Sequence, residues 1–255
     1  MDWSQKVVFI TGASSGIGRA LAVELGRRGA SLGLLARRAE TLAEIVADVE
    51  KAGGRALALP SDVKDAVSMR AAAERLRGKF GRIDVLVANA GMGTITDGAD
   101  LSAEDVAEVI NVNLIGAVNS VAAVVPEMIK QGSGQLVAIS SLAAYRGLPK
   151  SGAYCASKAA LSAFFESLRL DLRRTGVDVT IIHPGFIKTP LTDGRHARMP
   201  YLMELDDAVG KIVRAIEARK KSCAFPWQLA SIVRASMLMP IAMYDRIAAR
   251  NSFRE

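Results

Sequence analysis

The sequence has only two cysteines and no excess of glycine or proline, and these shortages exclude several classes of protein. Cys155 and Cys223 form neither a disulfide framework nor a metal-binding pattern. We therefore expect packing roles for both thiols, no metal site, and a reducing, cytoplasmic compartment. With 22 glycines and 8 prolines among 255 residues, half of them hydrophobic, a fibrous or disordered chain is also excluded.

Long uninterrupted apolar runs are missing as well. Asp2 and the shortness of the apolar run 7–10 exclude a secretory signal at the N-terminus. The apolar segment 112–126 contains Asn113 and Asn119, which favours a core helix over a membrane span.

Positive charge is present but dispersed. Lysine and arginine (33) outnumber aspartate and glutamate (26), which gives a net charge of +7. The basic residues lie in scattered pairs such as Arg27–Arg28, without interleaved aromatic residues, so we expect no nucleic-acid partner. Attraction to an anionic cofactor fits this distribution better.

Short apolar runs alternate with segments of helical periodicity along the chain. The runs predict strands at 6–10, 31–36, 55–59, 83–88, 135–140, 177–182 and 223–225. The periodic segments predict helices at 19–28, 40–52, 65–79, 101–130 (with Pro126 near a bend or break), 152–175 and 205–221. This alternation predicts an α/β fold, a Rossmann-like doubly wound parallel sheet of about seven strands with helices on both faces. No linker divides the chain, so we expect one domain over residues 1–255.

A glycine-rich turn follows the first predicted strand. Gly12, Gly16 and Gly18 have the spacing Gly-x-x-x-Gly-x-Gly and stand immediately before a helix. At such a junction the backbone N–H groups and the positive end of the helix can bind a diphosphate. The turn therefore predicts a dinucleotide site.

A second motif is the pair Tyr154 and Lys158, which lie four residues apart on one helix face. A free tyrosine has a pKa of about 10, and lowering it to about 7 requires roughly 4 kcal/mol of differential stabilisation. One nearby ammonium group in a partly buried site supplies an energy of that order. The alternative interpretation is a solvated helix face with a snorkelling lysine.

These motifs together resemble the short-chain dehydrogenases/reductases, over nearly the whole chain to about residue 190. The resemblance implies catalytic roles for Tyr154, for Lys158 and for Ser141, which precedes the tyrosine by thirteen residues. Ser140 is the alternative serine. The resemblance also implies that Asn113 opens its helix locally and holds a water molecule in a proton relay.

The glycine turn and the resemblance also predict the cofactor site. The predicted contacts are Gly12, Ser14, Ser15, Gly16, Ile17, Gly18, Arg37, Arg38, Asp62, Val63, Asn89, Ala90, Gly91, Tyr154, Lys158, Pro184, Gly185, Ile187 and Thr189. No acidic residue lies between Ser31 and Ala39 to bind a ribose 2′-hydroxyl, and Arg37 suits a 2′-phosphate, so we expect NADP(H) rather than NAD(H). Two alternatives remain: Arg38 begins a solvated helix, and Asp62 caps the next helix.

The resemblance predicts an NADP(H)-dependent oxidoreductase that interconverts a secondary alcohol and a carbonyl compound. The alternatives are a non-catalytic redox sensor on the same fold and a nucleotide-sugar epimerase or dehydratase, which would need a larger C-terminal domain. We expect a homodimer or homotetramer, with contacts through helices 101–130 and 152–175.

Substrate choice is expected to depend on segments 92–98 and 142–151 and on an irregular lid at about 186–205. In the C-terminal helices, at about 227–250, Leu229, Ile232, Val233 and Met237 form one stripe. This stripe packs on the protein's own core or a second copy in the favoured interpretation. In the other, it rests on a membrane surface and admits a lipophilic substrate.

Overall fold

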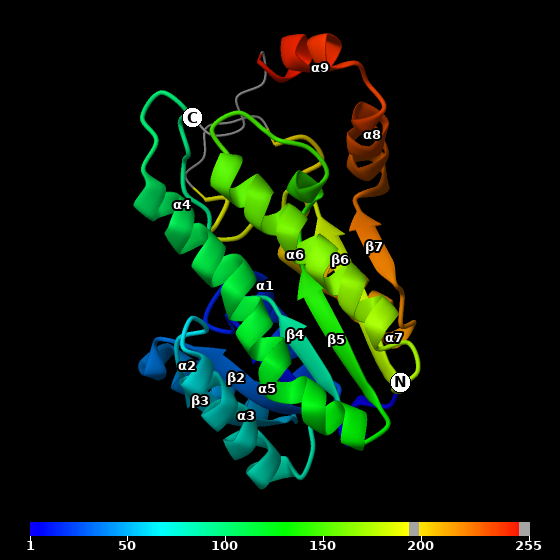
Figure 1. Cartoon of the computed structure of the whole chain (residues 1–255). Helices are drawn as coiled ribbons and strands as arrows, with labels where there is room; N and C mark the ends of the chain where they lie inside the picture. The colour runs from blue at the N-terminus through cyan, green and yellow to red at the C-terminus, as the bar shows by residue number, and fades with distance from the viewer. Residues whose placement is uncertain (194–198, 250–255) are drawn as a thin grey trace.

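Seven parallel strands form a single sheet at the centre of the molecule (Figure 1). The computed structural model describes residues 1–193 and 199–249; residues 194–198 of the predicted lid and residues 250–255, the first of which belongs to the predicted C-terminal helices, lie outside them. The strands are β1 (Val7–Thr11), β2 (Ser31–Ala36), β3 (Arg55–Pro60), β4 (Val85–Ala88), β5 (Gly134–Ile139), β6 (Val177–Pro184) and β7 (Ser222–Phe225). Their order is β3-β2-β1-β4-β5-β6-β7, so the predicted doubly wound parallel sheet is confirmed.

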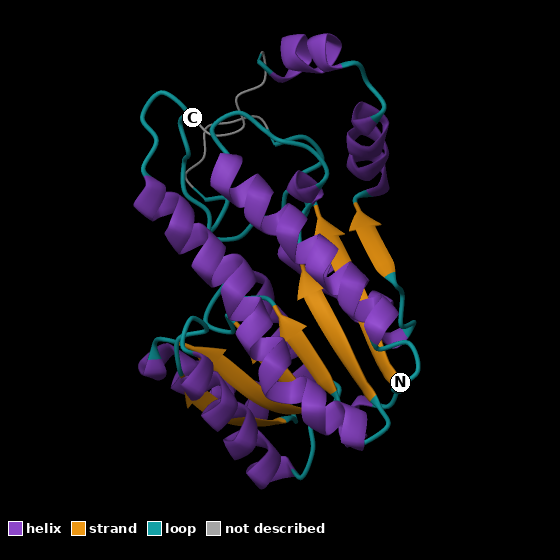
Figure 2. Ribbon diagram, viewed as in Figure 1, coloured by secondary structure: helices purple, strands orange, loops and turns teal. Residues whose placement is uncertain are grey.

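Helices cover both faces of this sheet (Figure 2). They are α1 (Gly16–Arg27), α2 (Ala39–Lys51), α3 (Ala66–Phe80), α4 (Ala103–Ile110), α5 (Gly116–Lys130), α6 (Gly152–Asp171), α7 (Leu205–Glu217), α8 (Trp227–Met237) and α9 (Ile241–Ala248). Buried side chains of α1, α2 and α7 form the core on one face, and those of α3, α5 and α6 form the core on the other. Because β1, β2, β4 and β5 are buried throughout, their sequences are apolar without alternation.

The long helix predicted at 101–130 is interrupted around Asn113, where the resemblance implied a local opening, and not at Pro126. A π-helical turn at Asn111–Ile115 separates α4 from α5, whereas α5 continues through Pro126. The proline removes one hydrogen bond to the carbonyl of Ala122. Both residues are exposed, so water can satisfy that carbonyl.

The segment Ala103–Lys130 is long and apolar enough to cross a membrane by length and composition alone. Its side chains at Val121, Val124 and Met128 are buried in the core formed with α3 and α6. These contacts fit the core helix that the sequence predicted.

The predicted apolar stripe of the C-terminal helices is divided between core and solvent. Leu229 is buried and Val233 packs partly beside it, while Ile232 and Met237 are exposed. Helix α9 has no buried residue at all among those described. In Figure 1, α8 and α9 extend beyond the carboxyl end of β7.

A close contact between α3 and β2 provides a test of the packing. A Cβ atom at Gly33 would lie 2.5 Å from Cδ2 of Leu76, whereas a Cβ at Gly78 on the exposed side of α3 would meet nothing within 4 Å. We expect Gly33→Ala to lower the free energy of unfolding by about 1–3 kcal/mol through overpacking. Gly78→Ala should raise it by about 0.5–1 kcal/mol. Urea titrations of both variants measure these values, and equal effects would contradict the packing described.

Candidate active site

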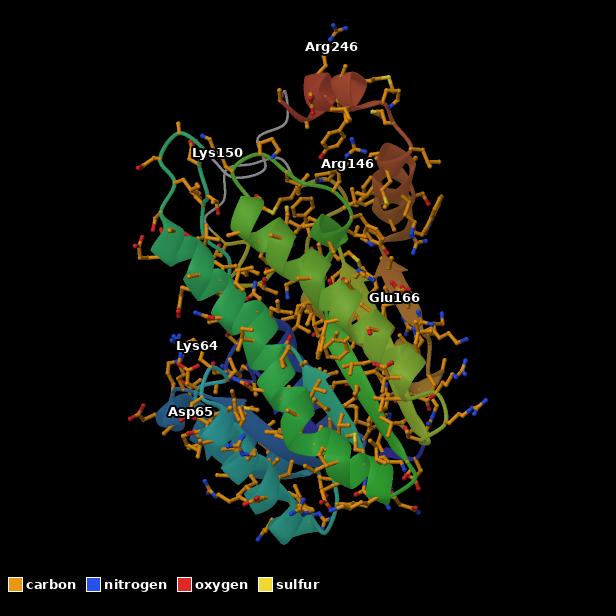
Figure 3. All side chains as sticks on the ribbon, viewed as in Figure 1. Lys64, Asp65, Arg146, Lys150, Glu166 and Arg246 are labelled. Carbon is orange, nitrogen blue, oxygen red and sulfur yellow. The ribbon has the colours of Figure 1, made fainter. Side chains whose placement is uncertain are left out.

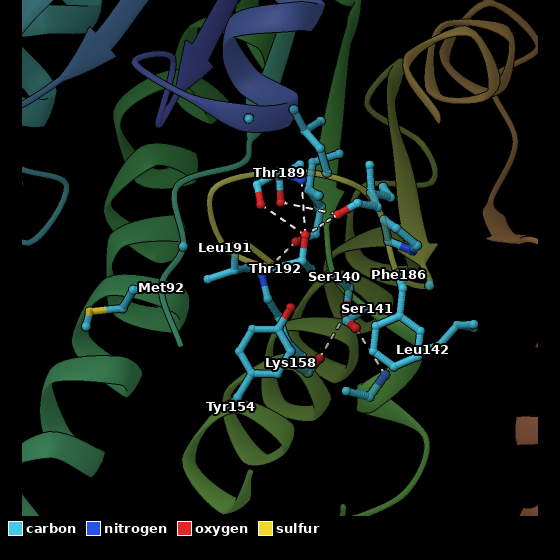
Figure 4. A pocket seen from close by; sticks show the side chains of 18 of the residues that line it. Met92, Ser140, Ser141, Leu142, Tyr154, Lys158, Phe186, Thr189, Leu191 and Thr192 are labelled. Atoms are coloured by element: carbon cyan, nitrogen blue, oxygen red, sulfur yellow. Dashed lines mark hydrogen bonds between the residues drawn. The ribbon is translucent and has the colours of Figure 1, made fainter. Parts of the chain in front are cut away.

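A cavity of about 980 Å³ lies at the carboxyl edge of the sheet (Figure 4). The carboxyl ends of all parallel strands meet at this edge, so the loops that follow them converge there. The cavity is lined by nineteen of the predicted site residues: Gly12, Ser14, Ser15, Gly16, Ile17, Arg37, Arg38, Asp62, Val63, Asn89, Ala90, Gly91, Ser141, Tyr154, Lys158, Pro184, Gly185, Ile187 and Thr189. Two predicted residues, Gly18 and Asn113, lie behind its wall.

The glycine turn after β1 is packed tightly on its inner side. Gly12 has φ +66°, and a Cβ there would lie 2.7 Å from Cα of Ala90. A Cβ at Gly18 would lie 2.4 Å from the carbonyl oxygen of Gly12, so this glycine allows α1 to pack on the turn. The amide of Asn89 donates to the carbonyls of Thr11 (2.9 Å) and Gly12 (3.2 Å). The turn is thereby fixed to β4, while the outer side with Ser14, Ser15 and Gly16 faces the cavity.

Two guanidinium groups lie at the end of β2. Arg38 donates to the hydroxyl of Ser14 over 3.2 Å, which ties the segment after β2 to the glycine turn. Within the described residues, neither Arg37 nor Arg38 forms an ion pair with a carboxylate. This end of the cavity therefore offers unneutralised positive charge to an anionic group.

Asp62 does not cap α3, so that alternative is wrong. The N-cap is Asp65, whose carboxylate accepts from the backbone N–H groups of Val67 (2.8 Å) and Ser68 (3.2 Å). Asp62 instead accepts from the backbone N–H of Lys64 over 2.9 Å and lines the cavity.

Lys158 is buried between α6 and the end of β5, with 4% of its surface exposed. Its ammonium group donates to the carbonyl of Ile139 over 2.8 Å and lies 5.8 Å from the ring centroid of Tyr154. Burial lowers the pKa of Lys158 to about 8. The group is still mainly protonated at neutral pH, so it places a positive charge beside the tyrosine. Figure 4 shows Tyr154, Lys158 and Ser141 around one pocket.

The two serines after β5 have different surroundings. Ser140 is buried and its hydroxyl lies 3.1 Å from the carbonyl of Lys158 and 2.7 Å from the hydroxyl of Ser162. Ser141 accepts from the backbone N–H of Ala143 over 3.1 Å, and within the described residues no acceptor takes its hydroxyl hydrogen. Ser141 is therefore better placed than Ser140 to donate to a substrate.

Asn113 lies in the π-helical turn and is fully buried. Its side chain accepts from the backbone N–H of Met92 (2.7 Å) and donates to the carbonyl of Met92 and the hydroxyl of Ser157, both at 2.9 Å. Ser157 in turn donates to the carbonyl of Tyr154 over 2.8 Å. Asn113 thus connects the segment after β4 to the turn that carries Tyr154. Both of its amide hydrogens are used, so only an oxygen atom of Asn113 could bind a relay water, and the predicted relay role of Asn113 stays a prediction.

His183 is buried beside the site but does not line the cavity. Its ring packs against Tyr145, with centroids 4.9 Å apart, and burial lowers its pKa. These contacts give His183 a packing role beside the site.

Sequence reasoning missed specific residues in the lid and in the wall formed by the C-terminal helices. In the lid, the hydroxyl of Thr192 donates to the carbonyl of Ile187 (2.6 Å) and accepts from the N–H of Thr189 (3.0 Å). Arg146 and Tyr244 also line the wall. Arg146 falls within the segment expected to select the substrate, but no motif distinguished it. No sequence pattern pointed to Tyr244, because it contacts the site only through the fold.

The geometry agrees with comparisons to known proteins. Residues 6–200 match the family model described as short chain dehydrogenase. The chain is 41% identical to an uncharacterized oxidoreductase of Myxococcus xanthus over 98% of both chains. It is 32% identical to ketoacyl reductase HetN of Nostoc over 83% of this chain and 75% of that protein. A short-chain dehydrogenase/reductase from Burkholderia phymatum, solved in complex with NAD, is 25% identical with a TM-score of 0.86, covering 100% of this chain and 98% of that one.

The burial of the Lys158 ammonium group should make the unfolding free energy depend on pH. An unfolded lysine keeps its proton up to about pH 10.5, whereas the folded chain releases it near pH 8. Between these values the unfolded state binds more protons, so the unfolding free energy of the wild type should rise with pH relative to Lys158→Met. The difference in unfolding free energy between the wild type and Lys158→Met should change by about 3 kcal/mol across this window. Below pH 8 this difference should not depend on pH.

Denaturant titrations between pH 7 and pH 10 measure this difference. Lys220→Met, at an exposed position, is the control for the loss of one positive charge. A wild-type to Lys158→Met difference that does not change with pH would show that burial does not perturb Lys158.

Proposed function

The chain belongs to the short-chain dehydrogenase/reductase family, and we propose that it is an NADP(H)-dependent oxidoreductase that interconverts a secondary alcohol and a ketone or aldehyde. One observation carries this proposal: Ser141, Tyr154 and Lys158 line the same cavity as a glycine turn and two arginines. The name of the Nostoc relative, a ketoacyl reductase, supports reduction of a carbonyl group.

In the proposed mechanism the nicotinamide, when bound, supplies or accepts a hydride. Tyr154 donates its phenolic proton to the carbonyl oxygen in the direction of reduction. Ser141 donates a hydrogen bond to the same oxygen and positions it. The ammonium of Lys158 stabilises the phenolate that remains on Tyr154, and its burial strengthens this interaction because little water screens it.

The residues at the other end of the cavity fit an NADP(H) molecule. The outer side of the glycine turn and the N-terminus of α1 suit a pyrophosphate. Arg37 and Arg38 suit a 2′-phosphate, and β2 ends without an acidic residue that would repel it. The Burkholderia protein holds NAD, so we infer the preference for NADP(H) from these residues rather than from the family.

The proposal extends to the substrate, the assembly and the location. The wall near α8 and α9 is mainly apolar, which supports a lipophilic substrate. Exposed apolar residues such as Ile115 and Leu170 on the helices at 101–130 and 152–175 support contacts between copies in a dimer or tetramer. A cytoplasmic location agrees with the two free thiols.

Removing the proton donor tests the chemistry. We expect Tyr154→Phe to lower kcat by about 10²-fold to 10⁴-fold, the usual contribution of a general acid. NADPH should still bind, as measured by its fluorescence in a titration. Tyr145→Phe is the matched control, since Tyr145 does not line the cavity and should keep its activity. Comparable turnover in the Tyr154→Phe variant would refute the assignment.

Exchanging the charge at the end of β2 tests the cofactor. The wild type should use NADPH better than NADH, because a lost charge-assisted hydrogen bond to the 2′-phosphate costs roughly tenfold or more in affinity. Arg37→Asp should reverse this preference, because the carboxylate repels the 2′-phosphate of NADPH and accepts a hydrogen bond from the free 2′-hydroxyl of NADH. Initial rates with both coenzymes measure the ratio, and Arg19→Asp, at a residue outside this cavity, controls for the change in charge. A wild type that prefers NADH would contradict the interpretation of Arg37.

A further inference from the structure

The charged residues of the cavity are unevenly distributed. Among the described residues they are Arg37, Arg38, Asp62, Lys158 and Arg146. The first three lie at the nucleotide end, and Lys158 lies beside Tyr154. In the half formed by the loop after β5, α8 and α9, Arg146 is the one charged side chain that the described part of the chain contributes, and no acidic side chain there lines that half.

Arg146 is held in a fixed orientation by both C-terminal helices (Figure 3). Its Nη1 donates to the carbonyl of Ser236 in α8 over 2.7 Å, and its guanidinium carbon lies 4.0 Å from the ring centroid of Tyr244 in α9. The hydroxyl of Tyr244 donates to the carbonyl of Gly147, which fixes the ring. Stacking on a ring leaves the in-plane N–H donors of a guanidinium accessible.

This guanidinium is half-buried and has few partners. Within the described residues it forms one hydrogen bond and no ion pair, although it carries five N–H donors. The nearest titratable groups on the packed helices do not neutralise it: Asp245 is exposed, and Arg234 adds a second positive charge beside Tyr145. A half-buried arginine with free donors in an otherwise apolar wall is suited to a planar anion.

We propose that Arg146 is a specificity-determining residue that binds the carboxylate of an amphiphilic substrate, a keto acid or hydroxy acid with a long apolar chain. The proposal rests on the proposed function, because the carbonyl of the same molecule must reach Tyr154. The side chains of Leu142, Phe186 and Leu229 line the cavity and suit the apolar chain between the two polar ends. The guanidinium fork binds both carboxylate oxygens, while its stack on Tyr244 limits the entropy lost on binding.

The test compares a homologous series of keto fatty acids with their methyl esters, which differ in charge but hardly in length. NADPH oxidation gives kcat and KM for each pair. We expect the wild type to prefer the acid at the chain length that spans the cavity. Arg146→Gln should lower the acid-to-ester ratio of kcat/KM by roughly 10-fold to 100-fold, mainly through the KM of the acid. Arg146→Lys should retain part of the preference.

Arg234→Gln is the matched control, because it removes a positive charge from α8 at a residue that does not line the cavity. It should leave the ratio unchanged. If Arg146→Gln impairs acid and ester equally, Arg146 only clamps α8 and α9, and the proposal is overturned. A wild type without preference for the acid at any chain length overturns it as well.

A failure of the proposed function can be distinguished from a failure of this inference. If the wild type turns over neither acid nor ester with NADPH or NADH, the proposed reaction is wrong. Calorimetric titration of the NADPH-saturated protein with the same acids then decides the binding role. Weaker binding of the acid by roughly 10-fold to 100-fold in Arg146→Gln supports the inference, and equal or undetectable binding in both proteins overturns it.

Discussion

The position of the Lys158 ammonium group constrains the rest of the site. A buried cation needs a fixed hydrogen-bond acceptor, and the end of β5 supplies one in the carbonyl of Ile139, 2.8 Å away. Gly91, in the segment after β4, lies beside the group: a Cβ there would lie 3.4 Å from Nζ, an ordinary van der Waals distance. The sheet therefore supplies the acceptor for the Lys158 ammonium group. Helix α6 must pack against the end of β5 closely enough for this hydrogen bond to form.

The attachment of α6 to the end of β5 also explains why the adjacent serines Ser140 and Ser141 have different surroundings. Ser140 ties the end of β5 to the turn of α6 that carries Lys158, and the next residue, Ser141, consequently points into the cavity. On the other side, Asn113 and Ser157 connect the segment after β4 to the backbone of Tyr154. One end of the turn with Tyr154 and Lys158 is thus attached to β5 and the other to the segment that follows β4, so its geometry is set at the carboxyl edge of the sheet.

The sheet could be predicted from the sequence because strands buried on both faces are mainly apolar along their whole length, and the motifs identified the candidate catalytic side chains. Local alternatives with similar chemistry could not be separated. Asp62 and Asp65 are both plausible caps three residues apart, and only the coordinates show that Asp65 is the cap. Pro126 looked like the break in its helix, but an exposed carbonyl tolerates a proline, and the π-helical turn lies at Asn113, where the resemblance implied a local opening.

The C-terminal helices were the least predictable part, because an apolar stripe specifies that a face is buried but not what buries it. Here Leu229 packs near Gly185, where a Cβ would lie 2.9 Å from its Cδ2, but Leu238 remains 90% exposed. Since α9 has no buried residue, its position depends largely on Tyr244 and on the guanidinium of Arg146. The same contacts that place these helices therefore shape the proposed substrate half of the cavity, whereas the glycine turn and the ends of β2 and β4 form the proposed nucleotide half. Substrate preference can change with the C-terminal sequence while the catalytic geometry is retained.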